Sequence, residues 1–568
     1  MRRCFLIFLL CFMMLGHSTV VVNSLDGRDV VSGIYYAAIR GENIVFIRPM
    51  YDARLVYSKI GSNGNVFLIQ SKSSPVITGM AADLKNMGNR VELFESEDPY
   101  KTNLYLAGKS GASKFILVDS VYGYNTVSAL AYAKLNSMYL IFIDKSNLDS
   151  VVSFLKSKSP REVLLYGYID AESKKALENE GISYTEINNG DKFDDNLQIV
   201  EMYFKKNPTK RQVIVSDGNA FEDTIAKGDD PVILVSPLPP TYVYDYIKQK
   251  AAQGQIKVLL IVDNEYTQPI YNLKTSINSE LGVTALHAFV KIGESTSAAG
   301  GMRQVELFPL PGPVLGLTIE KVEYNTLTKQ LEVTYANTGN ALEYAKSQIR
   351  LLIDGNLVST VGDDDFFALG RGEKVGRTYP VNVESGDLFT NITVLYGSSK
   401  RAAEAGFMMG LPVGRVEFTD KSSLNISGFT ADKNTGDLYI TYTNTGNIPL
   451  YFRPDATVIN GAMSTKIRSD TVYALQPGKG EMVKFPGLVN DGVRIIGGAN
   501  YGAREAFLNK RVEKEYVPAA GTPGIDMNAI LFGVIVLLVI LVVYLLFDKI
   551  KGGKQHSTTV PPKASRKN

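Results

Sequence analysis

The chain has 568 residues, long enough for about three to five domains of roughly 100 to 200 residues each. Its 60 Lys and Arg residues against 58 Asp and Glu residues give a formal net charge of +2, without the excess that sequence-independent phosphate binding requires, so we expect no nucleic-acid partner. Hydrophobic residues make up 45% and charged residues 21%, which is typical of folded domains rather than of a disordered chain.

The first residues predict a secretory signal over 1–19. Arg2 and Arg3 precede an apolar run, Cys4–Leu15, and small residues follow it. A basic start, an apolar segment and a small-residue cleavage zone, in this order, are typical of an exported chain. We therefore expect the mature protein to leave the cytoplasm.

The cysteines and histidines limit the chemistry of the exported part. Both cysteines, Cys4 and Cys11, lie in the predicted signal. Of the three histidines, His17 is at the cleavage zone and His556 is near the C-terminus, which leaves His287 as an expected ordinary packed or surface histidine. A disulfide, a thiol nucleophile and a multi-histidine zinc site are thereby excluded. We expect no enzymatic activity, no catalytic residue, no cofactor and no metal.

Three similar units are predicted over 20–114, 115–211 and 212–294. Short apolar segments recur at nearly equal spacing and place three polar residues in equivalent positions: Asn23, Asp119 and Ser216. Within each unit, apolar runs alternate with helical segments, such as the one expected to start after Ser74–Pro75 and to end at Gly88. This alternation predicts an α/β fold with parallel sheets and crossover helices.

Two of the units carry further signatures. In the third unit, Ala220–Gly228 is followed by Pro231–Val235. The second unit carries other elements: Ser128–Asn136, Val163–Gly167, Ala176–Ile182 and Asn189–Phe193. These segments resemble the cell-wall-binding repeat type 2 family, with its phenylalanine-aspartate-alanine and proline-isoleucine-leucine-leucine elements. The resemblance implies three repeats that pack as a flavodoxin-like, Rossmann-like trio and anchor surface proteins to anionic wall polymers.

Polar and glycine residues follow the first strand of each unit. Because ligands bind outside the carboxyl ends of parallel strands, these loops are candidates for contact with an envelope polysaccharide or an anionic wall polymer. Three related loops would bind one repetitive polymer with avidity. The alternative is that these residues only form turns. The candidate ligand-binding residues are Asp26, Gly27, Asp119, Ser120, Asp217 and Gly218.

A linker rich in proline and glycine is predicted over 295–313, and the helical pattern ends there. After it, Tyr335–Asn340 recurs as Tyr442–Asn447 among alternating apolar and polar residues. This alternation predicts two tandem all-β, immunoglobulin-like sandwiches, over 314–410 and 411–517. The asparagine-threonine-glycine turn and a later leucine-x-proline-glycine element resemble CARDB domains, which implies extracellular adhesion-type modules.

The sandwich sequences contain smaller motifs. Asn391 and Asn425 begin sequons for N-glycosylation and are candidate modification sites. Asp354–Gly355 and Asn460–Gly461 favour a positive φ and predict tight hairpin turns. The run Asp363–Asp365 lacks the alternating ligand spacing of a calcium loop, so we expect a solvated turn there.

An uncharged apolar segment, 527–547, is predicted to be a transmembrane helix, because at about 1.5 Å per residue it spans a hydrocarbon core of about 30 Å. Asp526 precedes it and a basic tail, 548–568, follows it, so the positive-inside rule places the tail in the cytoplasm. Terminal helices of this kind are common in archaeal surface proteins, which points by analogy to a prokaryotic source. We expect a single-pass protein of the cell surface.

Two functions remain. The first is a non-enzymatic, membrane-anchored surface protein with a glycopolymer-binding head on β-sandwich spacers, as an S-layer or adhesion component that contacts other surface-layer proteins. The second is a surface ligand receptor, or a hydrolase that works with paired carboxylates, in clefts between the αβ units. The small catalytic inventory favours the first.

Overall fold

The structure is a computed structural model. The residues that it describes are 18–48, 53–236, 239–292, 307–383, 385–432, 436–460, 463–469, 471–485, 488–489 and 494–516. The predicted signal up to His17, most of the predicted linker, the segment 527–547 and the tail 548–568 lie outside them. Within these ranges, no helix has the length and apolarity needed to cross a membrane.

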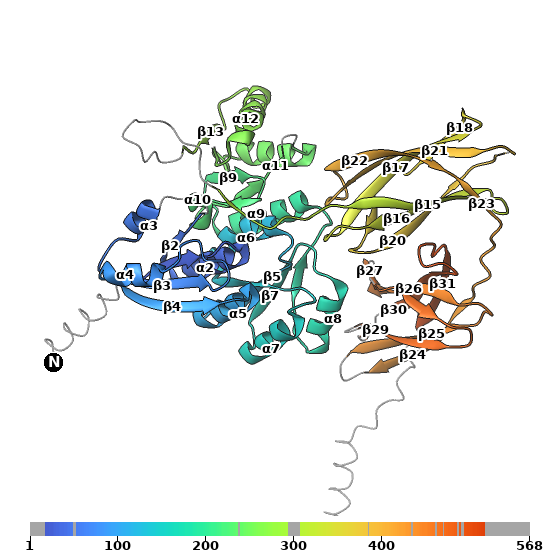
Figure 1. The fold of residues 1–568 in the computed structure, drawn as a ribbon, viewed down its shortest axis with the longest axis horizontal. Helices are drawn as coiled ribbons and strands as arrows, with labels where there is room; N and C mark the ends of the chain where they lie inside the picture. Colours follow the sequence, from blue (N-terminus) through green and yellow to red (C-terminus); the bar gives the residue numbers. More distant parts are fainter. Residues whose placement is uncertain are drawn as a thin grey trace, which may run out of the picture.

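The first half of the chain forms three αβ units (Figure 1). The first consists of β1 (Thr19–Asn23), α2 (Gly27–Arg40), β2 (Asn43–Phe46), α3 (Ala53–Ile60), β3 (Asn65–Ser71), α4 (Met80–Asn86), β4 (Arg90–Ser96) and α5 (Pro99–Ser110). The second consists of β5 (Lys114–Val118), α6 (Gly123–Asn136), β6 (Met138–Phe142), α7 (Leu148–Lys158), β7 (Glu162–Tyr166), α8 (Ala171–Asn179), β8 (Thr185–Ile187) and α9 (Lys192–Lys206). The third consists of β9 (Gln212–Ser216), β10 (Ala220–Phe221), α10 (Asp223–Ala226), β11 (Val232–Leu234), α11 (Thr241–Ala252), β12 (Val258–Ile261), α12 (Thr267–Leu281) and β13 (His287–Val290).

Each unit has a four-stranded parallel sheet with the same topology. The strand orders are β2-β1-β3-β4, β6-β5-β7-β8 and β11-β9-β12-β13. In each, the first and third strands are central and the second strand is an edge, which is the order in which flavodoxin-like sheets begin. The prediction of three α/β units with parallel sheets is confirmed.

The structure corrects the repeat alignment by one residue in the third unit. The first residue after the second strand donates its N–H to Val22 in the first unit, to Val118 in the second and to Ser216 in the third. Asn23 and Asp119 are therefore equivalent, but their counterpart is Asp217 rather than Ser216. The physical reason is that β9 buries a serine where β1 and β5 bury a valine, so the apolar run ends one residue early.

Helix α4 begins at Met80 and not directly after Ser74–Pro75, as the sequence predicted. The side chain of Asn23 accepts from the Ile77 N–H (2.9 Å) and donates to the Ile77 carbonyl (2.7 Å), which holds this stretch as a turn. Gly79, at φ 78, then precedes the helix. The serine-proline pair therefore marks a turn here rather than a helix start.

Helices α5 and α9 join each unit to the next. The side-chain amide of Asn103, in α5, donates to the Leu140 carbonyl (3.0 Å) and accepts from the Phe142 N–H (3.1 Å) on edge strand β6. Asn196, in α9, forms the same two bonds with edge strand β11, at 2.8 Å each. Both asparagines are buried. Because an edge strand leaves backbone groups without partners, each asparagine supplies what a further strand would supply.

The contact between the third and the first unit is built differently. Asp223 forms ion pairs with Arg48 (3.0 Å) and Lys59 (3.1 Å) of the first unit. Phe308, in β14 (Phe308–Pro309), packs edge-on against Phe46, with ring centroids 6.1 Å apart. β14 also pairs with β10, so the segment that leaves the head closes the contact between the third and the first unit. The other two contacts are closed by helices α5 and α9, through Asn103 and Asn196.

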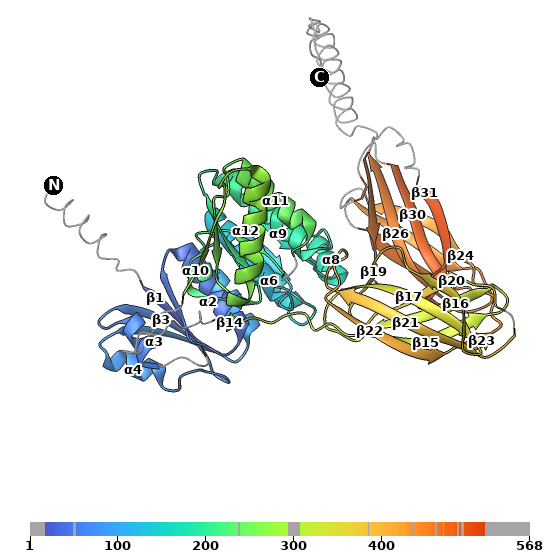
Figure 2. The same cartoon turned by 90° about the horizontal axis from the view of Figure 1, so that it is seen from above.

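The second half forms two β-sandwiches (Figures 1 and 2). The first consists of β15 (Leu317–Asn325), β16 (Gln330–Asn337), β17 (Glu343–Ile353), β18 (Asn356–Gly362), β19 (Phe367–Leu369), β20 (Lys374–Pro380), β21 (Leu388–Gly397), β22 (Ala405–Pro412) and β23 (Gly414–Val416). The second consists of β24 (Leu424–Asp432), β25 (Asp437–Asn444), β26 (Leu450–Asn460), β27 (Met463–Arg468), β28 (Tyr473–Leu475), β29 (Gly480–Phe485), β30 (Arg494–Gly502) and β31 (Lys510–Tyr516). Apart from β23, which pairs parallel with β15, the pairing is antiparallel, so two antiparallel β domains are confirmed.

The repeated asparagine-threonine-glycine element has a structural role in both sandwiches. Asn337 is buried and donates to the carbonyls of Ala341 (2.8 Å) and Leu369 (3.0 Å). Asn444 donates in the same way, at 2.9 and 3.0 Å, to the carbonyls of the equivalent loop. Asp354 and Gly355 adopt the predicted positive φ, whereas the second predicted hairpin turn includes residues outside the described ranges. Both sequon asparagines lie on strands, and their use stays a prediction: Asn391 in β21 and Asn425 in β24.

Asp363 does not lie in a solvated turn, as the sequence predicted. Its side chain is buried and accepts from the Ser347 hydroxyl (2.7 Å), the Tyr379 hydroxyl (3.0 Å) and the Arg377 guanidinium (2.9 Å). The apparent acidic turn therefore contains one carboxylate that serves as a hydrogen-bond centre of the first sandwich.

Side-chain contacts, both polar and apolar, hold the head, the first sandwich and the second sandwich together. Ser399 donates to Asp191 of the head (2.6 Å), and Arg401 pairs with Asp194 (2.8 Å). Between the sandwiches, the ring of Phe507 packs directly on the backbone of Gly376, where a Cβ would lie 2.6 Å from the ring. Side chains thus form both contacts, the one between the head and the first sandwich and the one between the two sandwiches.

Replacing Asn103 or Asn196 by leucine should destabilise the head, because each change leaves a buried N–H and a buried C=O without partners. At about 1 to 3 kcal/mol for each such group, we expect the free energy of unfolding to fall by at least about 2 kcal/mol in urea titrations. Hydrogen exchange at Phe142 or Leu234 should accelerate. Asn272→Leu, at an exposed position of α12, is the control and should change neither quantity. Unchanged exchange in both variants would contradict this role.

Candidate functional site: a groove between the first two αβ units

A groove of about 480 Å³ lies where β1 and β5 end. This volume is in the usual range of small-ligand sites, about 300 to 1,000 Å³. The first unit contributes Leu25–Arg28, the second contributes Ser120 and Val121, and the lining is completed by Pro309–Gly312 and Asn340. The groove therefore lies at the carboxyl ends of parallel strands from two units.

Asp26 organises the wall that the first unit provides. Its carboxylate caps α2 by accepting the Arg28 N–H (2.9 Å), and it also accepts from the Arg28 guanidinium, from Nε at 3.0 Å and from Nη2 at 2.7 Å. The guanidinium lies over the Tyr100 ring, 4.9 Å from its centroid. The hydrogen bond to Asp26 raises the pKa of Arg28 further above its ordinary value. The two charges of this wall thus bind each other.

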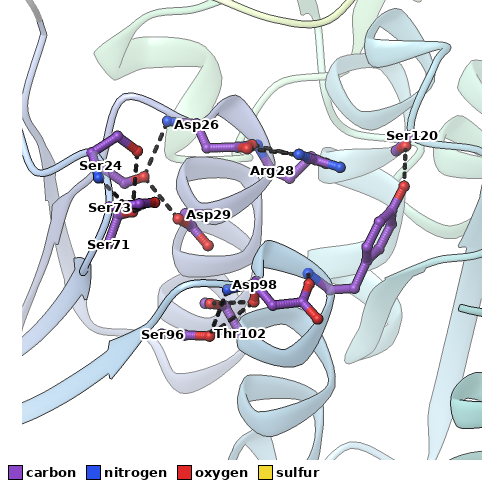
Figure 3. A network of polar contacts seen from close by, with 12 residues as sticks. Ser24, Asp26, Arg28, Asp29, Ser71, Ser73, Ser96, Asp98, Thr102 and Ser120 are labelled. Carbon is purple, nitrogen blue, oxygen red and sulfur yellow. Dashed lines mark hydrogen bonds and ion pairs between the residues drawn. The ribbon is translucent and has the colours of Figure 1, made fainter. Parts of the chain in front are cut away.

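Tyr100 connects this wall to the second unit. Its hydroxyl lies 3.1 Å from the Ser120 hydroxyl and donates to the Asp144 carboxylate. Figure 3 shows Asp26, Arg28 and Ser120 in this network. Burial, with the hydrogen bond to Asp144, raises the pKa of Tyr100, so its hydroxyl remains a proton donor at neutral pH.

Serine hydroxyls hold the loops behind the wall (Figure 3). Ser24 accepts from the Asp26 N–H (3.0 Å) and donates to Asp29 (2.7 Å). Ser71, at the end of β3, lies 3.1 Å from the Ser74 hydroxyl. Burial raises the pKa of Asp29. The Leu25 N–H donates to the Ser74 carbonyl (3.0 Å), so the loop that presents Asp26 is anchored at the ends of both β1 and β3.

A strap, Phe308–Gly312, crosses the ends of all three units. In the third unit, β14 pairs with β10 and the Leu310 N–H donates to a loop carbonyl (2.8 Å). In the second unit, the Gly123 N–H of α6 donates to the Pro311 carbonyl (3.1 Å). A Cβ on Gly123 would lie 2.3 Å from that oxygen, and a Cβ on Gly27 would lie 3.1 Å from the Pro311 ring. Glycines at the starts of α2 and α6 therefore let the strap form one side of the groove.

The structure brings together two of the three loops predicted from the sequence. Asp26, Gly27 and Ser120 line the groove. Asp119 lies beside Ser120, and its carboxylate accepts the Val121 N–H (2.9 Å). The first two units thus form a composite site, and the third reaches it through the strap.

The third predicted loop lies away from this lining. Gly218 is buried at φ 82, and a Cβ there would lie 2.7 Å from the Cβ of Tyr124. Asp217 accepts from the Asn219 N–H (2.8 Å) and from the Tyr266 hydroxyl (3.2 Å). These contacts explain both residues by packing and turn formation.

Arg28, Tyr100 and the strap were not predicted from the sequence. The spacing of Asp26 and Arg28 is a local signal, because a carboxylate that caps a helix can also bind a guanidinium two residues later. Tyr100 comes from α5, and no local pattern links it to the first loop. The strap prolines were assigned to the linker, since their contacts depend on tertiary structure.

The carboxyl groups beside the groove have divergent pKa values. Burial raises the pKa of Asp119 to about 6, and the charges of Asp144 and Asp170 add to this shift. Burial acts in the same direction on Asp144, but hydrogen bonds from Ser146 and Tyr100 outweigh it and lower the pKa. At neutral pH both groups are thus mainly ionised, with Asp119 the easier to protonate.

The lining of the groove contains no histidine and no cysteine. His287 is exposed on β13, where its ring stacks on Phe289 at a centroid distance of 6.4 Å. In the part of the chain that the structure describes, no three or more His, Cys, Asp or Glu side chains are arranged to hold a metal ion. The polar side chains that line the groove are those of Asp26, Arg28, Ser120 and Asn340.

A smaller cavity lies at the joint between the second unit and the first sandwich. Its volume of about 20 Å³ has room for about one water molecule. Asn125, Asp195 and Tyr344 are among its lining residues, and burial raises the pKa of Asp195 to about 7. Its size makes it unsuitable for a polymer, so the larger groove is the candidate site.

No family model and no curated protein matches this chain. Among solved structures, Cwp6 from Clostridium difficile is 17% identical with a TM-score of 0.33, over 42% of this chain and 40% of that one. Cwp8 from Clostridium difficile is 12% identical with a TM-score of 0.37, over 47% of this chain and 48% of that one. The YadV chaperone is 10% identical with a TM-score of 0.14, over 36% of this chain and 98% of that one. The chain thus matches less than half the length of either Cwp protein.

Asp119→Asn should make stability less dependent on pH. Because the folded-state pKa of about 6 exceeds an unfolded value of about 3.9, the protonated carboxyl contributes stability that is fully present below about pH 4 and is lost as the pH rises through 6. Asparagine keeps an acceptor but cannot ionise. At about pH 8, the free energy of unfolding of the variant should therefore exceed that of the wild type by about 2 kcal/mol, which raises its unfolding temperature. At about pH 4, the two proteins should unfold at similar temperatures. Asp149→Asn, at an exposed position of α7, is the control; an equal pH dependence in all three proteins would contradict the assignment.

Proposed function

We propose that this chain is a non-enzymatic cell-surface protein whose head binds an envelope glycopolymer. The groove at the strand ends of the first two units supports this proposal most directly, because it has the volume of a ligand site and its ion pair is internally satisfied. The signal predicted over 1–19 and the transmembrane helix predicted over 527–547 would place the groove outside the cell. The apolar and polar side chains that line the groove are sufficient for binding a polymer without turnover.

In this proposal, the αβ units are diverged cell-wall-binding repeats of type 2, and the sandwiches are CARDB-like spacers. The common strand order of the three units and the equivalent Asn337 and Asn444 support two sets of internal repeats. The side-chain ties between head and sandwiches suit a protein that holds its binding surface at a fixed distance from the membrane. A protein with this arrangement would serve as a component of a surface layer or as an adhesion protein.

A second candidate, a hydrolase with paired carboxylates, is favoured by one observation. Asp119 has a raised pKa and its neighbour Asp144 a lowered one. In many active sites with two carboxyl groups, the group with the raised pKa is the general acid and the other stays ionised as the base or nucleophile. The Asp144 carboxylate, however, already accepts from the N–H and the hydroxyl of Ser146 and from the Tyr100 hydroxyl. Binding therefore remains the preferred function.

Leu25→Trp should weaken polymer binding by about tenfold or more, because this half-exposed side chain lines the groove and an indole would narrow it. Cosedimentation with the envelope polysaccharide of the source organism measures the change. Leu135→Trp is the matched control, since Leu135 is 41% exposed, against 49% for Leu25, and lies at the far end of α6. Equal affinities of the two variants would contradict a binding role for the groove.

The wild-type protein should leave the polymer intact. Size-exclusion chromatography of the polysaccharide after prolonged incubation should show the starting chain length, and reducing-end assays should show no new ends. The Asp119→Asn and Asp144→Asn variants distinguish the two candidates. Chain shortening by the wild type that both variants abolish would establish the hydrolase instead.

A further inference from the structure

The positive charge of the groove, on Arg28, is offset by the neighbouring carboxylate of Asp26. Arg28 donates to both oxygens of Asp26, and the two side chains are 28% and 26% exposed. The aromatic ring of Tyr100 covers one face of the guanidinium. A phosphate or a carboxylate on a polymer would have to displace Asp26 to take the edge of Arg28 formed by Nε and Nη2, and at the remaining N–H groups it would be repelled by the nearby Asp26 charge.

The helix starts beside the groove are also occupied. The first turn of an α-helix binds anions through its free N–H groups and its dipole. At α2, the Asp26 carboxylate already caps these groups through the Arg28 N–H. At α6, the Pro311 carbonyl of the strap accepts the Gly123 N–H. Both starts therefore carry an acceptor that belongs to the protein.

Carboxyl groups lie behind the second-unit wall. Asp119 adjoins Ser120. Burial is the main cause of its raised pKa, the charges of Asp144 and Asp170 add to it, and Arg371 of the first sandwich opposes them in part. An anionic polymer in the groove would meet these carboxylates with no free cation in the lining to offset them. Electrostatics thus disfavours a polyanion at this place.

The remaining lining fits an uncharged sugar. Leu25, Val121, Pro309, Leu310 and Pro311 give apolar walls, against which the carbon-bound faces of a pyranose can pack. The Ser120 hydroxyl and the Asn340 amide are neutral hydrogen-bonding groups on the same surface. The lining thus offers apolar contact and a few neutral polar groups.

We infer that the polymer segment held in this groove is a neutral saccharide, and that the Asp26–Arg28 pair is what excludes phosphorylated or uronate-bearing chains. This inference rests on the proposed function and changes the expectation of an anionic wall polymer. It also gives Asp26 a role in specificity, since removing its charge would release the guanidinium of Arg28. The groove should then accept an anion.

The test compares the full-length wild type with Asp26→Ser and Asp149→Ser. Serine keeps a capping oxygen, so Asp26→Ser preserves α2 while freeing Arg28. Asp149 is exposed in the first turn of α7 and does not line the groove, so its exchange is a control for the loss of one carboxylate. The probes are envelope polysaccharide separated by anion exchange into uncharged and acidic fractions, and inorganic phosphate followed by thermal shift.

We expect the wild type to bind the uncharged fraction with an affinity that varies less than about twofold between about 50 and 500 mM NaCl, and to show no stabilisation by phosphate. Asp26→Ser should gain at least about tenfold in affinity for the acidic fraction and be stabilised by phosphate, whereas Asp149→Ser should not. Salt-sensitive binding of the acidic fraction by the wild type, or no gain in Asp26→Ser, overturns the inference. If the wild type binds neither fraction, the proposed function fails, and the phosphate titrations of the three proteins still decide the role of Asp26.

Discussion

The edges of parallel sheets impose the main constraint on this head, because each edge strand carries N–H and C=O groups that must find partners. Two buried asparagines, Asn103 and Asn196, meet this need across unit boundaries, each from the last helix of one unit to the second strand of the next. The same bond pair thus completes a sheet and joins two units. This explains how three small sheets share one continuous apolar core.

The contact between the third and the first unit is closed by a different element. There Phe308 and the short β14 follow the third unit, and the chain continues as the strap across α2 and α6. Gly27 and Gly123 accept it because a side chain at either position would crowd Pro311. The groove is therefore a result of how the head is closed: two loops form its walls and the strap fixes its width.

Local patterns were enough to predict the architecture and only part of the site. Apolar runs and helix signals gave three α/β units and two β domains, because these depend on burial and on short-range geometry. The alignment failed at Ser216, where a small polar residue is buried inside a strand, and the assignment of Asp363 failed because its partners come from other strands. Tyr100 and Pro311 reach the groove only through tertiary packing, which no local spacing encodes.

The central claim is that an envelope glycopolymer lies in the groove between the first two units. Hydrogen exchange of the full-length protein, with and without the uncharged envelope polysaccharide, tests it most directly. The account predicts new protection at the amides of Leu25–Arg28, Ser120–Val121 and Leu310, with the sandwich strands unchanged. Protection confined to the sandwiches, or no protection at saturating polymer, would contradict it.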